Sequence, residues 1–244
     1  VMSRWKAAVL HFLISLAIFL GLLAVIVLQW YPGILFNIDS GWAGLQLVIG
    51  VDLIAGPLLT LVVFKTGKQG LSFDLSCIAF FQAACMAAGM WVIYSERPIA
   101  LVLAYDTFYS VDTETFLQYE RDPQSLEDFP GPYPKLIFIE LPESEIAAQI
   151  ASVRAQFIGD PLYIQTENYR AMPDSVDALR SAFRVEQSTR RGASEEVLSQ
   201  LDESCLFSKF VSSVTSGFVC FETDSRTLRK FYVSASEPGA IVEK

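Results

Sequence analysis

Three long apolar runs occupy the first 94 residues of this 244-residue chain, and no comparable run follows them. They fill residues 7–30, 41–64 and 72–94. A helix needs roughly 20 residues to cross a hydrocarbon core about 30 Å thick, so each run is long enough to span a membrane. The first run is longer than the apolar region of a cleavable signal, and we expect it to be retained. The sequence predicts an α-helical membrane protein with a three-helix transmembrane bundle over residues 1–96.

The rest of the chain, residues 97–244, has the composition of a soluble domain. Residues 95–244 hold 14 Lys and Arg against 24 Asp and Glu, a net charge of −10. This acidity argues against binding nucleic acid and against docking on anionic lipid, because both need a basic surface. A segment of this length can bury a core of its own.

Basic residues near the ends of the runs predict the orientation of the bundle. Arg4 and Lys6 precede the first run, and Lys65 and Lys68 lie between the second and the third. The connection over residues 31–40 contains neither Lys nor Arg. Basic residues in short loops stay on the cytoplasmic side, so the N-terminus is predicted to be cytoplasmic and the C-terminal domain to be exported.

The middle run contains a single carboxylate, Asp52, close to Gly56 and Pro57. An ionised Asp in mid-membrane costs about 2.5–3.5 kcal/mol on insertion scales, and Pro57 removes one helical hydrogen bond. One interpretation is a notch that docks another transmembrane helix or its charged end. The other is a structural Asp, either protonated or bonded to a polar residue of the bundle: Ser15, Gln46 or Thr60. The sequence leaves both interpretations open.

The cysteines fall into two pairs. Cys205 and Cys220 lie in the exported part, where a disulfide can persist, and closing a loop of this length stabilises by about 3 kcal/mol in the chain-entropy model. Two free thiols are the alternative. Cys77 and Cys85 lie in the third run and are expected to be buried small hydrophobes. Because His11 is the single histidine, neither a zinc site nor a histidine-dependent catalytic arrangement is expected.

The exported part shows separate runs of strand and helix signals, which favour an α+β fold. Strands are expected over residues 99–105, 108–111 and 135–141. Helices are expected over residues 142–157, 175–183 and 193–201. The first of these helices has apolar Ile146, Ile150, Val153 and Phe157 at helical spacing. The C-terminal end reads as an antiparallel meander over residues 206–214, 218–223 and 227–234.

Several stretches of the sequence resemble the TfpX/TfpZ family of type IV pilin accessory proteins. Residues 51–65 read VDLIAGPLLTLVVFK and residues 67–75 read GKQGLSFDL. Shorter matches are SRWKAA at 3–8, WYP at 30–32, RP at 97–98 and YDTF at 105–108. The matching motif positions are Asp52, Gly56, Pro57, Lys65, Lys68 and Asp74. The resemblance implies a bacterial inner-membrane protein that assists assembly or dynamics of a cognate type IV pilin, without enzymatic activity.

The leading hypothesis is a chaperone-like adaptor for a major type IV pilin, in which the bundle holds the pilin helix and the periplasmic domain, residues 97–244, contacts the pilin head. Asp52, Gly56 and Pro57 are the candidate partner-binding residues. No cofactor is predicted. One rival is an enzyme that modifies the pilin, which would need a catalytic constellation or a lipid-linked donor site. The other is an envelope sensor, which would need a cytoplasmic output domain.

Overall fold

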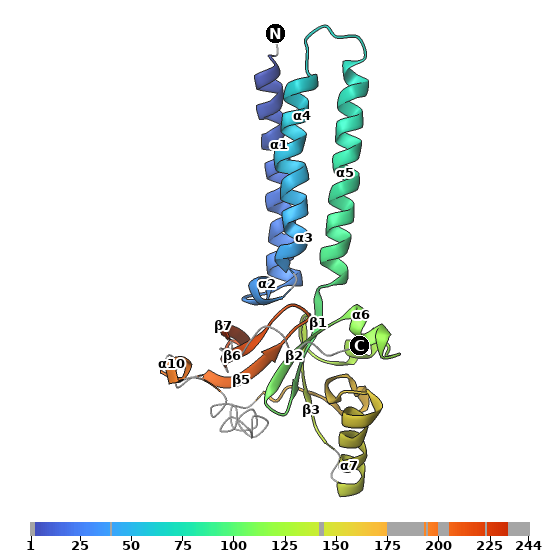
Figure 1. The fold of residues 1–244 in the computed structure, drawn as a ribbon, viewed down its shortest axis with the longest axis vertical. Coiled ribbons are helices and arrows are strands. Elements are labelled where there is room, and N and C mark those ends of the chain that lie inside the picture. The colour runs from blue at the N-terminus through green and yellow to red at the C-terminus, as the bar shows by residue number, and fades with distance from the viewer. Residues whose placement is uncertain are drawn as a thin grey trace. The chain divides into compact units, whose positions relative to one another are not determined.

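The structure is a computed structural model that describes residues 3–39, 41–141, 144–174, 193, 195–199, 205–222 and 224–233. The chain divides into two compact units (Figure 1). The first contains Val1–Pro32 and Ser40–Arg97, and the second contains Gly33–Asp39 and Pro98–Lys244. The sequence assigned residues 33–39 to the transmembrane bundle, whereas their contacts group them with the C-terminal domain.

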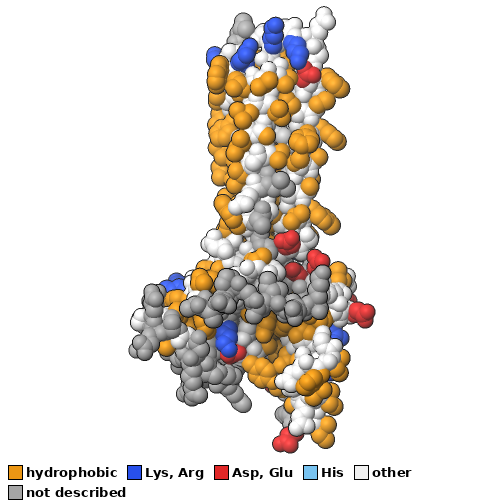
Figure 2. All heavy atoms as spheres, in the orientation of Figure 1, with side chains coloured by type: hydrophobic (Ala, Val, Ile, Leu, Met, Phe, Trp, Pro, Cys, Tyr) orange, Lys and Arg blue, Asp and Glu red, His pale blue; other side chains and the backbone are white. Residues whose placement is uncertain are grey.

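The first unit is built from the three apolar runs, each of which forms a long helix. Their bounds are α1 Arg4–Val25 with η1 Ile26–Trp30, then α3 Gly41–Val48 with η2 Ile49–Ala55 and α4 Gly56–Val63, and finally α5 Leu71–Ser95. Three helices, Arg4–Trp30, Gly44–Val63 and Leu71–Ser95, are long and apolar enough to cross a membrane. Figure 2 shows hydrophobic side chains over the sides of this unit and Lys and Arg side chains at one end. Side chains facing outward in this way suit a lipid surround.

Small residues let α3 and α5 approach closely. A Cβ atom on Gly44 would lie 2.3 Å from Cγ1 of Ile93, and one on Gly89 would lie 2.8 Å from Cγ2 of Val48. The Tyr31 hydroxyl donates a hydrogen bond of 3.1 Å to the carbonyl of the same Ile93. Close backbone approach through glycine is the usual way in which helices pack inside a membrane.

The second unit is built on a seven-stranded sheet in the order β4-β3-β1-β2-β5-β6-β7. The strands are β1 Pro98–Ala104, β2 Thr107–Asp112, β3 Lys135–Ile139, β4 Tyr169–Ala171, β5 Cys205–Val211, β6 Ser216–Glu222 and β7 Thr227–Val233. Strands β1 and β3 pair in parallel, as do β2 and β5, and the other neighbours pair antiparallel. The sheet is therefore mixed, and the predicted antiparallel meander describes only its last three strands.

The core of this unit lies around the central strand β1, every residue of which is buried. Its core cluster includes Val102, Val111, Phe116, Leu126 and Ile137. Two short helical segments bring core residues onto the sheet, α6 Thr113–Gln118 and the 3₁₀ turn η3 Pro123–Asp128. The Asp112 carboxylate caps α6 by accepting a 2.7 Å hydrogen bond from the Thr115 amide, as expected for an N-cap aspartate.

The remaining helical predictions have mixed outcomes. The helix expected over residues 142–157 is α7 Glu145–Val153, which continues as the π-helical turn η4 Arg154–Ile158. The helix expected over residues 193–201 is described only as α10 Glu195–Leu198. The one expected over residues 175–183 lies outside the described residues. Two 3₁₀ turns, η5 Leu162–Ile164 and η6 Thr166–Asn168, precede β4.

The short helix α2 Leu35–Ile38 belongs to the second unit, although the chain places it between two bundle helices. Leu35 and Ile38 are buried. Ser212 donates a 3.1 Å hydrogen bond to the Ile38 carbonyl, and Ser110 donates one to the buried Asp39 carboxylate. If the three long helices span a membrane, this contact requires that the first connection and the C-terminal domain share one side of it.

Candidate functional site

The candidate site lies inside the first unit, where the second apolar run departs from regular α-helix. Ile49–Ala55 forms a π-helical stretch, in which the Gly56 amide bonds the Val51 carbonyl five residues back. Pro57 follows at the start of α4. A proline has no amide hydrogen and its ring clashes with the carbonyl four residues before it, so a widened turn relieves the strain. Single π turns of this kind occur frequently at functional sites.

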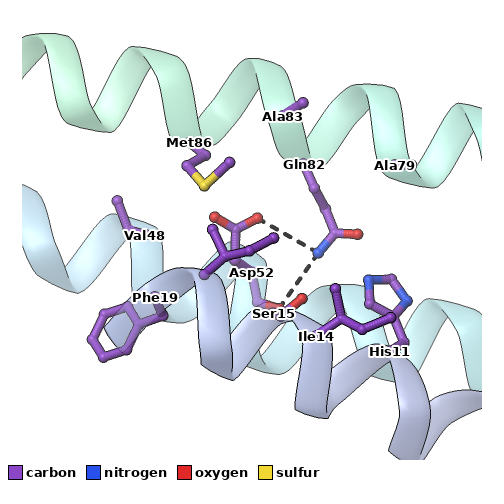
Figure 3. Close-up of a pocket in the computed structure, with 11 residues that line it drawn as sticks. His11, Ile14, Ser15, Phe19, Val48, Asp52, Ala79, Gln82, Ala83 and Met86 are labelled. Carbon is purple, nitrogen blue, oxygen red and sulfur yellow. Dashed lines mark hydrogen bonds between the residues drawn. The ribbon is translucent and has the colours of Figure 1, made fainter. Parts of the chain in front are cut away.

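Asp52 lies within this π-helical stretch and faces Gln82 of α5. The Gln82 Nε2 donates to the Asp52 Oδ1 at 3.5 Å and to the Asp52 backbone carbonyl at 3.4 Å (Figure 3). Both residues are buried, with 6% and 7% of their surface exposed. The candidate partners expected from the sequence were Ser15, Gln46 and Thr60. In the structure, the partner of Asp52 is instead Gln82, on the third long helix.

The hydrogen bonding of this pair is incomplete. Among the described residues, neither Oδ2 of Asp52 nor Oε1 of Gln82 has a hydrogen-bond partner, although both atoms are buried. The two bonds that do form, 3.4 and 3.5 Å long, exceed the usual N–H···O range of about 2.7–3.2 Å. A buried polar atom without a partner costs about 1–3 kcal/mol. The site therefore presents two unfilled acceptors in an apolar surround.

Gly56 makes room for this pair. A Cβ atom at position 56 would lie 2.0 Å from Nε2 and 2.5 Å from Cδ of Gln82. The Gln82 amide therefore occupies the space that a side chain at position 56 would need. The structure assigns Gly56 a packing role within the bundle.

His11 and Thr60 form a second polar contact near the pair. Nδ1 of His11 lies 2.5 Å from Oγ1 of Thr60, which joins α1 to α4. Thr60 is buried.

A cavity of about 220 Å³ adjoins these polar groups. Residues of all three long helices line it, among them His11, Ser15, Asp52 and Gln82 (Figure 3). Its apolar lining includes Ile18, Phe19, Val48 and Met86. The combination of an apolar wall with a few converging polar groups is typical of a binding site.

The predicted connection motif lies apart from the cavity, at the turn between α4 and α5. Lys68 and Asp74 form an ion pair of 2.5 Å, and Lys65 is exposed. Gly67 and Gly70 both adopt φ +79°, a left-handed conformation that favours glycine. These residues shape and close the turn. Of the three predicted partner-binding residues, Asp52 lines the cavity, whereas Gly56 packs against Gln82 and Pro57 begins α4.

The two exported cysteines lie on neighbouring strands. In the β5–β6 register, Cys205 pairs with Glu222 and Cys220 pairs with Phe207. The two positions are therefore diagonal in the register of adjacent strands. The side chain of Cys205 lies outside the described residues, and the disulfide stays a prediction. Cys77 and Cys85 are free, and Cys77 is exposed on the bundle rather than buried as expected.

Sequence reasoning missed two buried polar residues. Gln82 provides the partner of Asp52, and a polar residue in mid-span is itself a signal of a polar contact. Asp39 lies in the first connection, and no local pattern identifies its bond to Ser110. Among the described residues, no three His, Cys, Asp or Glu side chains gather closely enough to hold a metal ion.

These features define a class of protein: a helical membrane protein with an appended α+β domain. Comparison with known proteins narrows the class. The chain is 32% identical over 126 residues to the fimbrial assembly protein of serogroup E1 of Dichelobacter nodosus, and to the same extent to that of serogroup I. Each of these alignments covers 51% of this chain and 49% of the relative. The chain is 34% identical over 104 residues to the fimbrial assembly protein of serogroups C1 and C2, which covers 42% of this chain and 79% of that relative.

The chain belongs to this family of fimbrial assembly proteins. It spans about half the length of the first two curated relatives that it matches. No family model matches the chain. No solved structure matches it either.

Proposed function

We propose that this protein is a TfpX/TfpZ-type accessory protein of the bacterial inner membrane, which holds a type IV pilin subunit during fimbrial assembly without modifying it. The transmembrane bundle binds the subunit's apolar helix at the Asp52–Gln82 cavity. The C-terminal domain lies in the periplasm and contacts the subunit's exported head. Membership of the fimbrial assembly family supports the biological setting.

The observation that carries the proposal is the pair of unfilled acceptors beside the cavity. Asp52 and Gln82 each keep one buried oxygen without a partner among the described residues. A hydrogen-bond donor on a partner helix would satisfy these atoms, and the removal of their desolvation cost would favour binding. A carboxylate inside the membrane usually faces a protein partner or a water-filled space. The partner expected here is a transmembrane helix with a donor, cationic or neutral, at the depth of Asp52.

Two observations support the proposed orientation. Lys and Arg side chains gather at the end of the bundle that holds the N-terminus and the α4–α5 connection (Figure 2), as expected for a cytoplasmic end. Residues 33–39 contact the C-terminal domain, which supports a placement of both on one side of the membrane. A chain with three spans has its first connection and its C-terminal domain on the same side.

In-cell photocrosslinking tests the proposal directly. A photoreactive residue at Met86, which lines the cavity, is expected to trap the fimbrial subunit. The matched control is Phe80, which lies on the same helix and is 77% exposed, so that it faces lipid. A crosslink from Phe80 and none from Met86 would contradict the cavity as the docking site.

Substitutions at Asp52 separate binding from bundle stability. Asp52→Leu and Pro57→Ala are each expected to reduce co-purification of the subunit, while the bundle stays folded. Co-purification that survives both changes would remove the notch from the mechanism. The subunit's mass is expected to be the same with and without this gene, because the proposed role involves no modification. A mass difference would instead favour the rival function, an enzyme that modifies the pilin.

A further inference from the structure

The helix α7 and its continuation η4 carry their large apolar side chains on the outside of the second unit. The exposed fractions are 72% for Ile146, 56% for Ile150, 48% for Val153, 78% for Phe157 and 69% for Ile158. Figure 2 shows hydrophobic side chains over this region, at the lower right. These five residues are called the α7 seam below. A continuous apolar surface of this kind marks an interaction site.

The helix is held to its own domain by the opposite face. Ala151 is buried there, and its carbonyl accepts a 3.1 Å hydrogen bond from Nε2 of Gln165. Arg154 forms ion pairs with Asp160 and Glu167. The exposure of the seam is therefore not a sign of a detached helix, because small and polar side chains already anchor it.

The spacing of the seam suits pairing with another helix. Ile146, Ile150, Val153 and Phe157 follow one another at intervals of four, three and four residues. On the α-helix itself, Ile146, Ile150 and Val153 have the a/d spacing of a coiled coil, in which side chains of one helix insert between those of the other, and Phe157 follows in the π-helical turn η4. The spacing reads the same in both directions, so two copies of the seam bring apolar residues together in a parallel or an antiparallel arrangement.

The exposed area is sufficient for a two-fold pair. A large apolar residue exposes about 200 Å² when fully accessible, so the five side chains present roughly 600 Å² and a pair would bury roughly 1,200 Å². That is the lower bound for specific interfaces. Anchoring both copies in one bilayer would raise their effective concentration, so an interface of this size can still hold them together.

We propose that the α7 seam is a self-association surface, occupied by the same seam of a second copy of this chain. Two copies that pair through the same seam are related by a two-fold axis, which brings like residues together. The net charge of −10 over residues 95–244 opposes an alternative in which the seam inserts into anionic lipid. The proposal is independent of subunit binding at the Asp52–Gln82 cavity.

Two differently tagged copies of the full chain, co-expressed and extracted in mild detergent, provide the test. Affinity purification through one tag is expected to co-purify the copy that carries the other tag. Ile150→Asp in both copies is expected to reduce that recovery about tenfold or more, since a carboxylate would be buried without a partner. Ser144→Asp is the matched control, because it adds the same charge at the exposed N-cap of α7, away from the seam, and is expected to leave recovery unchanged.

Charge pairing across the interface separates lost binding from misfolding. One copy with Ile150→Asp is combined with a second copy that carries either Ile150→Lys, for parallel pairing, or Val153→Lys, for antiparallel pairing. Recovery restored by one combination supports the proposal, because a folding defect could not be repaired by a second mutant copy. Three results would overturn it: wild-type copies that do not co-purify, recovery unaffected by Ile150→Asp, or a photocrosslinker at Phe157 that traps the fimbrial subunit instead of a second copy.

Discussion

Replacing Gly56 by alanine is the sharpest test of the buried pair, because the new atom has a defined neighbour. The added Cβ would lie 2.0 Å from the amide nitrogen of Gln82 and 2.8 Å from its Oε1. The Gln82 side chain is buried and cannot swing into solvent. To make room, it must leave its hydrogen bonds to Asp52 or push α5 away from α4.

Two costs follow from this displacement. Overpacking a filled interior costs about 1–3 kcal/mol. Losing the Gln82 donor to the Asp52 carboxylate leaves a second buried oxygen unpaired, at about 1–3 kcal/mol. The expected loss in the free energy of unfolding is about 2–6 kcal/mol relative to a matched control. That control is Gly50→Ala, because a Cβ at position 50 meets no atom within 4 Å and the change in helix propensity is the same.

The natural probe is tryptophan fluorescence during equilibrium unfolding of the full chain in bicelles. All four tryptophans lie within residues 1–97, so their emission reports on the bundle rather than on the C-terminal domain. Adding Gln82→Ala to Gly56→Ala removes the clash, and the double variant is expected to be at least about 1 kcal/mol more stable than the sum of the single changes. Equal stability of Gly56→Ala and Gly50→Ala would refute the packing argument.

Three further predictions concern other parts of the chain. Lys135→Met removes hydrogen bonds to two loop carbonyls at 2.7 and 2.8 Å, and is expected to cost about 2–3 kcal/mol and to speed proteolysis of the preceding loop. Burial works to raise the pKa of Glu167, but the hydrogen bond and charge of Arg154 hold that pKa below its ordinary value of 4.5. The pair therefore stabilises the domain above pH 4.5 and loses this effect as the pH falls further. Glu167 is half-exposed, so Glu167→Gln should lower stability at neutral pH by less than about 1 kcal/mol and converge with wild type in acid. A reporter fused after Lys244 should be active outside the cytosol, and one inserted within residues 66–70 should be active inside it.

The three long helices could be predicted from sequence because their signal is local. Each apolar run predicts a helix of membrane-spanning length by itself, whatever its neighbours do. The structure adds irregularities that the sequence predicts only in part. Pro57 indicates a weakened helix, and the structure contains a π-helical stretch from Ile49 to Ala55 before it. Hydropathy alone gives no sign of this wider turn.

The partner of Asp52 could not be predicted in the same way. Which polar residue meets a carboxylate depends on how each helix is rotated about its axis, and that rotation follows from the packing of all three helices. Thr60 lies on the same chain segment as Asp52 but contacts His11. Gln82 reaches Asp52 because Gly56 leaves space between α4 and α5.

In the C-terminal domain, sequence patterns predicted individual elements but not how those elements pack together. Helical periodicity predicted α7 through Ile146, Ile150, Val153 and Phe157, and the helix is present. The apolar stripe nevertheless faces outward, since periodicity reveals an apolar face without revealing what covers it. Strand order is equally non-local: β2 lies beside β5 although nearly a hundred residues separate them, and no repeat or spacing indicates that pairing.

The energetics of the Asp52–Gln82 pair favour a binding role over a purely structural one. A polar pair that stabilises a membrane bundle should be fully hydrogen-bonded, because a half-satisfied buried network is worse than an apolar one. Here the two bonds are 3.4 and 3.5 Å long, and each side chain keeps an oxygen without a partner among the described residues. The bundle therefore gains little from Asp52 by itself. Binding of a partner helix that brings a donor would be favoured by this pair. The donor would satisfy acceptors that are already desolvated in the folded bundle, so their desolvation would add no cost to binding.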